Sequence, residues 1–148
     1  MLLRYIWRMK LVIDTNVLVA ALRSRNGASN ALLIRVLDGS TVWLCSVPMF
    51  LEYEDVLMRA EFVLDTGHSR AALATFLTDI AAAITPVELN FLWRPQLPDP
   101  KDEMVLEAAA NGGADVIVTF NTKDFRLAVP RFGLDLLTPA ETLRRIPA

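Results

Sequence analysis

The sequence is poor in the residues on which many enzyme mechanisms depend. It contains one cysteine, Cys45, and one histidine, His68. An intramolecular disulfide is therefore impossible, and a zinc site built from the usual nitrogen and sulfur ligands is excluded. The sequence also has neither a P-loop nor a G-x-G-x-x-G motif, which are common phosphate-binding loops. Any metal ion bound by this chain would need oxygen ligands.

The chain also lacks a strong net charge and a long apolar run. Its net charge of −2 provides no overall positive field for nucleic acids, so such binding would have to come from local patches. No apolar run approaches the ~20 residues that cross a bilayer, and the start MLLRYIWRMK lacks the features of a signal peptide. We therefore expect a cytoplasmic protein without a membrane partner. We interpret residues 1–8 as an extension and residues 9–148 as the folded domain.

The composition is that of one compact domain, with 148 residues of which 53% are apolar and 22% charged. Short apolar runs alternate with helical patterns along the chain. We expect strands at 11–13, 42–45, 84–89, 116–119 and 134–137, and helices at 16–22, 28–37, 48–59, 69–83, 101–111 and from 139 onward. Unbroken apolar strands between helices indicate a parallel sheet covered on both faces. We predict a single-domain α/β fold with three layers (αβα) and a mostly parallel, doubly wound sheet.

One acidic residue stands in the middle of the apolar stretch KLVIDTNVLVAAL, which covers residues 10–22. Asp14 directly follows the first expected strand. In doubly wound folds, ligands bind at the carboxyl ends of the strands. A helix N-cap is the structural alternative for Asp14, but Thr15 and Asn16 can serve that purpose too. We therefore favour a chemical role for Asp14.

Two further acids mark the start of the helix expected at 101–111. Asp99 precedes a proline, which is typical of an N-cap followed by the first helical position, so on its own we interpret Asp99 as structural. Asp102 differs, because Val105, Leu106 and Ala109 share its helix face and place it on the inward side. An inward acid in the first turn of a helix can be explained by its favourable interaction with the helix dipole. Because Asp102 would face another acid at a strand end, we favour a role as a metal ligand.

The remaining oxygen donors leave alternatives open. In the helix expected at 48–59, Glu52 and Glu54 border the apolar stripe from opposite sides, and periodicity does not choose between them. Asn121 and Asp124, in FNTKDF, are either turn residues or ligands. Carboxylate and amide oxygens together suit Mg²⁺ or Mn²⁺, and crowded like charges need a cation or protonation to be tolerated.

These segments form an ordered set of motifs: VIDTNVLVAAL, S-x5-E from Ser46 to Glu52, DPKDEMVLEAAANGGADVIVT and FNTKDF. In this order the set resembles the PIN domain, specifically the VapC-like ribonucleases that are the toxins of toxin–antitoxin pairs. The resemblance covers nearly the whole chain, from about Met9 to Ile146. It implies a doubly wound sheet, a dependence on Mg²⁺ or Mn²⁺, and endoribonuclease activity on RNA. It also implies a cognate antitoxin protein as partner and a homodimer.

The resemblance further implies roles for individual residues by their motif positions. It selects Glu52 as the second acid because of the spacing from Ser46. The catalytic residues that it implies are Asp14, Glu52, Asp102 and Asp124. The metal ligands that it implies are Asp14, Glu52 and Asp102, with Asp99 and Asn121 as additional ligands. Family members often have aspartate where this chain has Asn121, so this chain carries one charge fewer there.

Two other functions are consistent with parts of the sequence. A phosphotransferase of the haloacid-dehalogenase type would use Asp14 as its nucleophile, but such enzymes have a second aspartate two residues later, where this chain has Asn16. A catalytically inactive PIN-like binding module is the other alternative, and the largely intact set of acids argues against it.

Overall fold

Five parallel strands form the centre of the molecule. The computed structural model describes residues 8–147, so residues 1–7 of the expected extension lie outside the described residues. The strands lie in the order β3-β2-β1-β4-β5, and every neighbouring pair is parallel. Their bounds are β1 (Lys10–Ile13), β2 (Val42–Cys45), β3 (Ile84–Pro86), β4 (Val116–Val118) and β5 (Asp135–Leu137). The predicted parallel, doubly wound sheet is confirmed, and its strand order reverses between β1 and β4.

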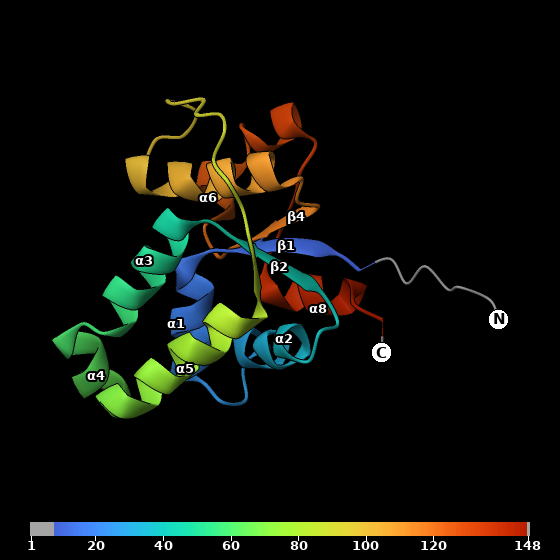
Figure 1. The fold of residues 1–148 in the computed structure, drawn as a ribbon. Coiled ribbons are helices and arrows are strands. Elements are labelled where there is room, and N and C mark those ends of the chain that lie inside the picture. The colour runs from blue at the N-terminus through green and yellow to red at the C-terminus, as the bar shows by residue number, and fades with distance from the viewer. Residues whose placement is uncertain (1–7, 148) are drawn as a thin grey trace.

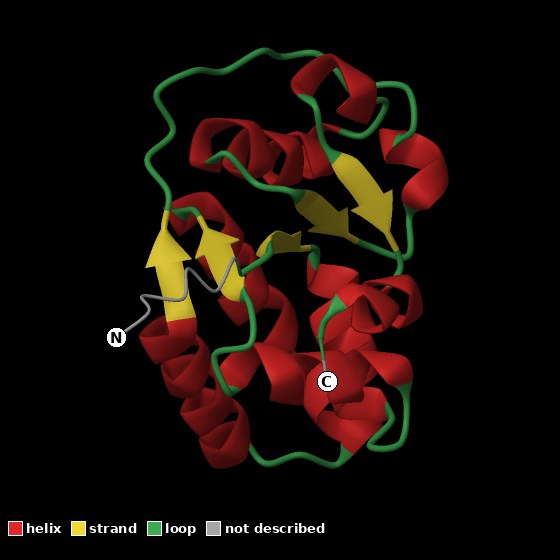
Figure 2. Ribbon diagram, turned by 90° about the vertical axis from the view of Figure 1, so that its right-hand side faces the viewer, coloured by secondary structure: helices red, strands yellow, loops and turns green. Residues whose placement is uncertain are grey.

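Helices cover both faces of the sheet and complete the predicted three layers (Figure 1). The helices are α1 (Thr15–Arg23), α2 (Ala28–Leu37), α3 (Val47–Leu57), α4 (Ala60–Thr66), α5 (Arg70–Ala83), α6 (Pro100–Gly112), α7 (Thr122–Phe125) and α8 (Pro139–Arg145). α6 packs on one face, whereas α1, α2 and α8 lie on the other, and Figure 2 shows the strands between these two groups. Among residues 8–147, no helix combines the length and the apolar character needed to cross a membrane.

The central strands are buried on both faces. The side chains of Leu11, Val12 and Ile13 in β1, and of Ile117 and Val118 in β4, are fully buried. A strand buried on both faces has no polar positions to alternate with apolar ones. This burial explains the unbroken apolar runs in the sequence.

Two element predictions from the sequence were wrong in their bounds by more than one residue. The strand expected at 84–89 ends at Pro86, because the chain then leaves the sheet and its backbone amides bind the side chain of Asn111. The helix expected at 48–59 ends at Leu57, and a separate helix, α4, follows it. The segment after β4, interpreted as a turn or ligand loop, contains the short helix α7.

A loop of residues 87–99, here called the strap, leads from β3 across α6 to the start of that helix (Figure 2). α6 holds the strap with side chains spaced four residues apart. Glu103 Oε1 accepts two strap backbone amides at 2.7 and 3.0 Å, and Glu107 forms a two-pronged ion pair with Arg94 at 2.8 and 2.9 Å. Asn111 accepts two further strap amides, both at 3.0 Å. These contacts fix where α6 begins, and therefore where its first-turn acids lie.

Candidate metal centre

The crevice between the carboxyl ends of β1 and β4 lies where the strand order reverses, which is where ligands bind in doubly wound folds. Asp14 follows β1 directly, and its backbone amide donates to the carbonyl of Val118 at 2.9 Å. Thr119 follows β4, and its buried hydroxyl donates to Asp14 Oδ2 at 2.7 Å. Asp14 occupies the N-cap position of α1, yet its side chain makes no capping hydrogen bond within the described chain. Capping therefore does not explain this carboxylate.

Asp14 borders a polar cavity of about 160 Å³ at this end of the sheet. Glu52 reaches the cavity from α3, whereas Glu54 lines a separate groove between α3 and α5. The structure thus brings Glu52 together with Asp14 and keeps Glu54 apart from them. The acidic and amide side chains of the lining are Asp14, Asn16, Glu52, Asp99, Asp102 and Asn121.

The start of α6 contributes two of these acids in different ways. Asp99 is exposed and caps the helix, because its Oδ1 accepts the backbone amide of Lys101 at 2.9 Å. The structural role that the sequence suggested for Asp99 is present, and its position in the cavity lining is additional to it. Asp102 lies in the first turn and is only 9% exposed, in agreement with the inward face that its spacing indicated.

Asn121 connects Asp102 to Asp124, the last acid of the motif set. Its side-chain Nδ2 donates to Asp102 Oδ2 at 3.3 Å and to Asp124 Oδ2 at 2.8 Å. Asp124 is half-buried in α7 and is not among the residues that line the cavity. It therefore joins the site through Asn121, whose neutral amide bridges two carboxylates.

The acids of this site are crowded together and partly removed from water. Burial raises the pKa of Asp14, and the nearby Glu52 raises it further, whereas the hydrogen bond from Thr119 opposes this shift. Burial also raises the pKa of Asp102 to about 6, and the neighbouring charges of Asp14, Asp99 and Asp124 add to the effect. Negative charge in this cavity is thus unfavourable unless a cation or a proton accompanies it.

The donor set fits a hard divalent cation such as Mg²⁺ or Mn²⁺, because the acidic and amide lining residues offer oxygen ligands. Within residues 8–147, no three acidic, histidine or cysteine side chains are already grouped tightly enough to hold a metal ion. The hydrogen bonds from Thr119 and Asn121 turn Asp14 and Asp102 toward their own partners. Metal binding would therefore require these acids to rotate their side chains toward a common point. Glu52 is half-buried and has the longest side chain of the three, so it has the greatest reach.

Two polar residues of this site were not predicted as functional: Thr119 was only the last residue of an expected strand, and Asn16 was a candidate for the helix cap. In the structure the Thr119 hydroxyl donates to Asp14 and accepts the backbone amide of Asn121 at 2.9 Å. The Asn16 side chain also approaches this hydroxyl, at 3.4 Å, and lines the cavity. The available signal was the position of Thr119 directly after a buried strand, which in this topology lies beside the strand that carries Asp14.

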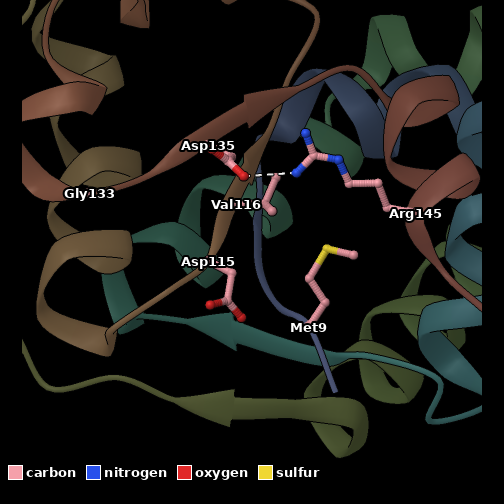
Figure 3. Close-up of a pocket in the computed structure, with 6 residues that line it drawn as sticks. All are labelled: Met9, Asp115, Val116, Gly133, Asp135 and Arg145. Atoms are coloured by element: carbon pink, nitrogen blue, oxygen red, sulfur yellow. Dashed lines mark hydrogen bonds and ion pairs between the residues drawn. The ribbon is translucent and has the colours of Figure 1, made fainter. Parts of the chain in front are cut away.

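A larger cavity, of about 390 Å³, lies at the opposite, amino-terminal end of the strands (Figure 3). Its two acids already have partners. Asp115 Oδ2 accepts the backbone amide of Lys10 at 2.8 Å, and Asp135 forms an ion pair with Arg145 at 2.8 Å. We place the candidate functional site in the smaller cavity, because four acids converge there and two of them, Asp14 and Asp102, have raised pKa values.

The fold and the site define an α/β protein with an acidic centre at the point where its sheet topology reverses. Residues 10–123 match the PIN domain family, and the chain belongs to this family. Its structure is similar to one chain of the crystal structure of VapBC2 from Rickettsia felis bound to a DNA fragment from their promoter. The similarity has a TM-score of 0.59 at 15% identity and covers 88% of this chain and 98% of that chain. It supports the fold. No curated protein matches the sequence significantly.

Proposed function

We propose that this protein is a metal-dependent endoribonuclease that hydrolyses phosphodiester bonds in RNA. The observation that carries the proposal is the convergence of buried acids at the carboxyl ends of β1 and β4, with pKa values raised by burial and by one another. Unfavourable charge of this kind is typical of functional sites that bind a cation. Membership of the PIN domain family supports the same activity, because the sequence motifs resemble those of its ribonucleases.

Three acids would hold the cation, directly or through water: Asp14, Glu52 and Asp102. Asp99 has one oxygen engaged in capping α6, so we assign it, with Asn121, a supporting role. When bound, Mg²⁺ or Mn²⁺ would polarise the phosphodiester and stabilise the charge that develops on the leaving oxygen.

The chain's own residues would prepare the attack of water on phosphorus, which breaks the bond from phosphorus to the leaving ribose oxygen. Asp124 would orient the attacking water with the carboxylate oxygen that Asn121 leaves free. Asn121 would keep Asp102 and Asp124 at a fixed separation through its two hydrogen bonds. Thr119 would fix the orientation of Asp14 through its hydroxyl.

We further propose that the protein is the toxin of a toxin–antitoxin pair, acting in the cytoplasm as a homodimer and neutralised by a cognate antitoxin. The support is the resemblance of its motifs to VapC-like toxins and its similarity in fold to a chain of VapBC2. Induced expression in bacteria should arrest growth, and the Asp14→Asn variant should not. Light scattering of the purified protein should give twice the 16.5 kDa mass of one chain. Normal growth with the active protein, or a single-chain mass, would contradict the respective part.

Two alternative functions remain from the sequence: a haloacid-dehalogenase-type phosphotransferase and an inactive PIN-like binding module. The family match favours a PIN nuclease over a phosphotransferase, and beryllium fluoride, a phosphate mimic, should not form a complex at Asp14. An inactive binding module would show neither Mn²⁺ binding nor cleavage.

The test is cleavage of an end-labelled single-stranded RNA by the purified protein with Mn²⁺ or Mg²⁺. We expect cleavage that stops when a chelator is added and is absent in the Asp14→Asn variant. The matched control is Asp135→Asn, which makes the same chemical change at the other end of the sheet and should cleave normally. Cleavage by Asp14→Asn at the rate of the unchanged protein, or cleavage that persists in chelator, would overturn the proposal.

A further inference from the structure

One cationic side chain lies among the acids of the candidate metal centre. Lys101 is the only lysine or arginine among the residues that line this cavity, which it shares with Asp14 and Asp102. Within the described chain, its ammonium forms no ion pair with any carboxylate. The arginines that do form ion pairs lie outside the cavity lining: Arg23, Arg35, Arg59, Arg94 and Arg145. The charge of Lys101 is therefore not engaged by the fold.

The position of Lys101 in its helix is also unfavourable for a cation. It is the second residue of α6, directly after Pro100, and the positive end of the helix dipole lies there. Only its backbone amide is used by the fold, as the donor to Asp99 Oδ1 at 2.9 Å. The side chain is exposed. Because neither pairing nor the dipole accounts for this positive charge, a ligand outside the fold is the better explanation.

We propose that Lys101 is a substrate-binding residue, whose ammonium binds a phosphate of the RNA strand at the cavity. The inference rests on the proposed ribonuclease function and adds a residue to that site. An acidic cavity repels the RNA backbone, and a cation at its edge offsets part of this repulsion while fixing the register of the strand. The exposure of Lys101 leaves its ammonium accessible to such a strand.

The experiment compares Lys101→Met with Lys101→Arg, which keeps the charge, and with Lys10→Met. Lys10 is an exposed lysine at the amino end of β1, so Lys10→Met makes the same change in charge at the far end of the sheet. Binding of a fluorescein-labelled single-stranded RNA is measured by anisotropy at several KCl concentrations, in the Asp14→Asn background so that the RNA is not cut. Steady-state kinetics with Mn²⁺ are measured in the otherwise unchanged protein.

For Lys101→Met we expect Kd to rise about tenfold, as for the loss of one charged hydrogen bond. The slope of log Kd against log[KCl] should fall by about 0.7, the value for one phosphate contact to a single strand. KM should rise by a similar factor, with kcat nearly unchanged. Lys101→Arg should restore both Kd and slope, and Lys10→Met should alter neither. The Tm of Lys101→Met should be unchanged or higher, because the change removes a cation from a helix start.

Two results would overturn the inference while the proposed function stands. One is an active protein whose Lys101→Met variant keeps the same Kd, salt slope and KM. The other is a Lys101→Met variant that binds Mn²⁺ more tightly by calorimetry without losing RNA affinity, since Lys101 would then be a counter-ion for the acids. A starting protein that neither binds Mn²⁺ nor cleaves RNA would instead overturn the proposed function, and the inference with it.

Discussion

The two ends of the central sheet carry aspartates in opposite circumstances. At the amino ends of the strands, Asp115 accepts a backbone amide at 2.8 Å, and Asp135 is paired with Arg145 at 2.8 Å. At the carboxyl ends, Asp14 and Asp102 are buried beside other acids, and neither takes part in a salt bridge within residues 8–147. Aspartates at the amino-terminal end thus bind a backbone amide or an arginine. Aspartates at the carboxyl end instead place negative charges close together without a cationic partner.

This difference separates the structural acids from the proposed functional ones more clearly than cavity size does. The amino-terminal cavity is the larger, at about 390 Å³ against 160 Å³, but its acids are satisfied. Buried charge without a counter-charge lowers the stability of the fold. Proteins retain such charge where activity depends on it. Substitutions at one end of the sheet can therefore be tested with substitutions at the other end as the reference.

The largest expected effect is the loss of activity in Asp102→Asn. This change keeps the shape of the side chain but removes a charge from the proposed metal ligands, which supply several kcal/mol of transition-state stabilisation through the bound ion. The initial rate of RNA cleavage with Mn²⁺ should therefore fall on the order of 100-fold or more. Asp135→Asn should change it by less than about twofold. Equal losses in both variants would remove the distinction between the two ends.

Thr119→Val should have the next largest effect, because it removes the hydroxyl that donates to Asp14 Oδ2. Outer partners of metal ligands contribute roughly 10- to 100-fold in activity or metal affinity. The free energy of unfolding should also fall by about 1–3 kcal/mol, since buried hydrogen-bonding groups lose their partner. Thr119→Ser keeps the hydroxyl and is the control. A valine variant as active as the serine variant would show that Thr119 does not position Asp14.

The stability of the protein in chelator should depend on pH through Asp102. Its pKa of about 6 in the fold exceeds the ordinary value of 3.8, so between these values the folded chain holds a proton that the unfolded chain has lost. The free energy of unfolding should then decrease as pH rises from 3.8 to about 6, and this contribution should level off above that range. Asp102→Asn should lack this part of the decrease, as urea unfolding at several pH values can test. If the free energy of unfolding varies with pH in the same way for both proteins, Asp102 does not have a raised pKa in the fold.

The smallest effect should come from the satisfied end. Asp135→Ala removes an ion pair whose side chains are 61% and 51% exposed, so solvent screens most of its energy. We expect the free energy of unfolding to fall by about 0.2–1 kcal/mol, with unchanged RNA cleavage. Urea denaturation measures the first quantity and the cleavage assay the second. A loss of activity here would show that the amino-terminal cavity takes part in function.

The sequence predicted the sheet well because the signal was local. Strands such as residues 11–13 and 116–118 are buried on both faces and therefore read as unbroken apolar runs. The break between α3 and α4 was not predicted, since apolar residues continue across it. Glu52 and Glu54 were equivalent by periodicity, and the choice of Glu52 came only from the resemblance. The structure separates them, because α3 packs with Glu52 beside the cavity and Glu54 in another groove.

The fine structure of the site could not be predicted for a different reason. Thr119 and Asp14 are 105 residues apart in sequence, and their contact exists only because β1 and β4 are neighbours. Likewise, the sequence could not show that the amide of Asn121 bridges Asp102 and Asp124, because this geometry depends on where α6 and α7 begin. Candidate residues follow from motif and spacing, whereas their hydrogen-bond partners follow from the tertiary structure.

The central claim is that the acids at the carboxyl end of the sheet form a divalent-cation site. Isothermal titration of Mn²⁺ into the purified protein at neutral pH tests it most directly, with Asp14→Asn and Asp135→Asn titrated in parallel. We predict saturable binding to the unchanged protein and to Asp135→Asn, and loss of that binding in Asp14→Asn. Binding that survives Asp14→Asn, or no binding to the unchanged protein, would contradict the claim.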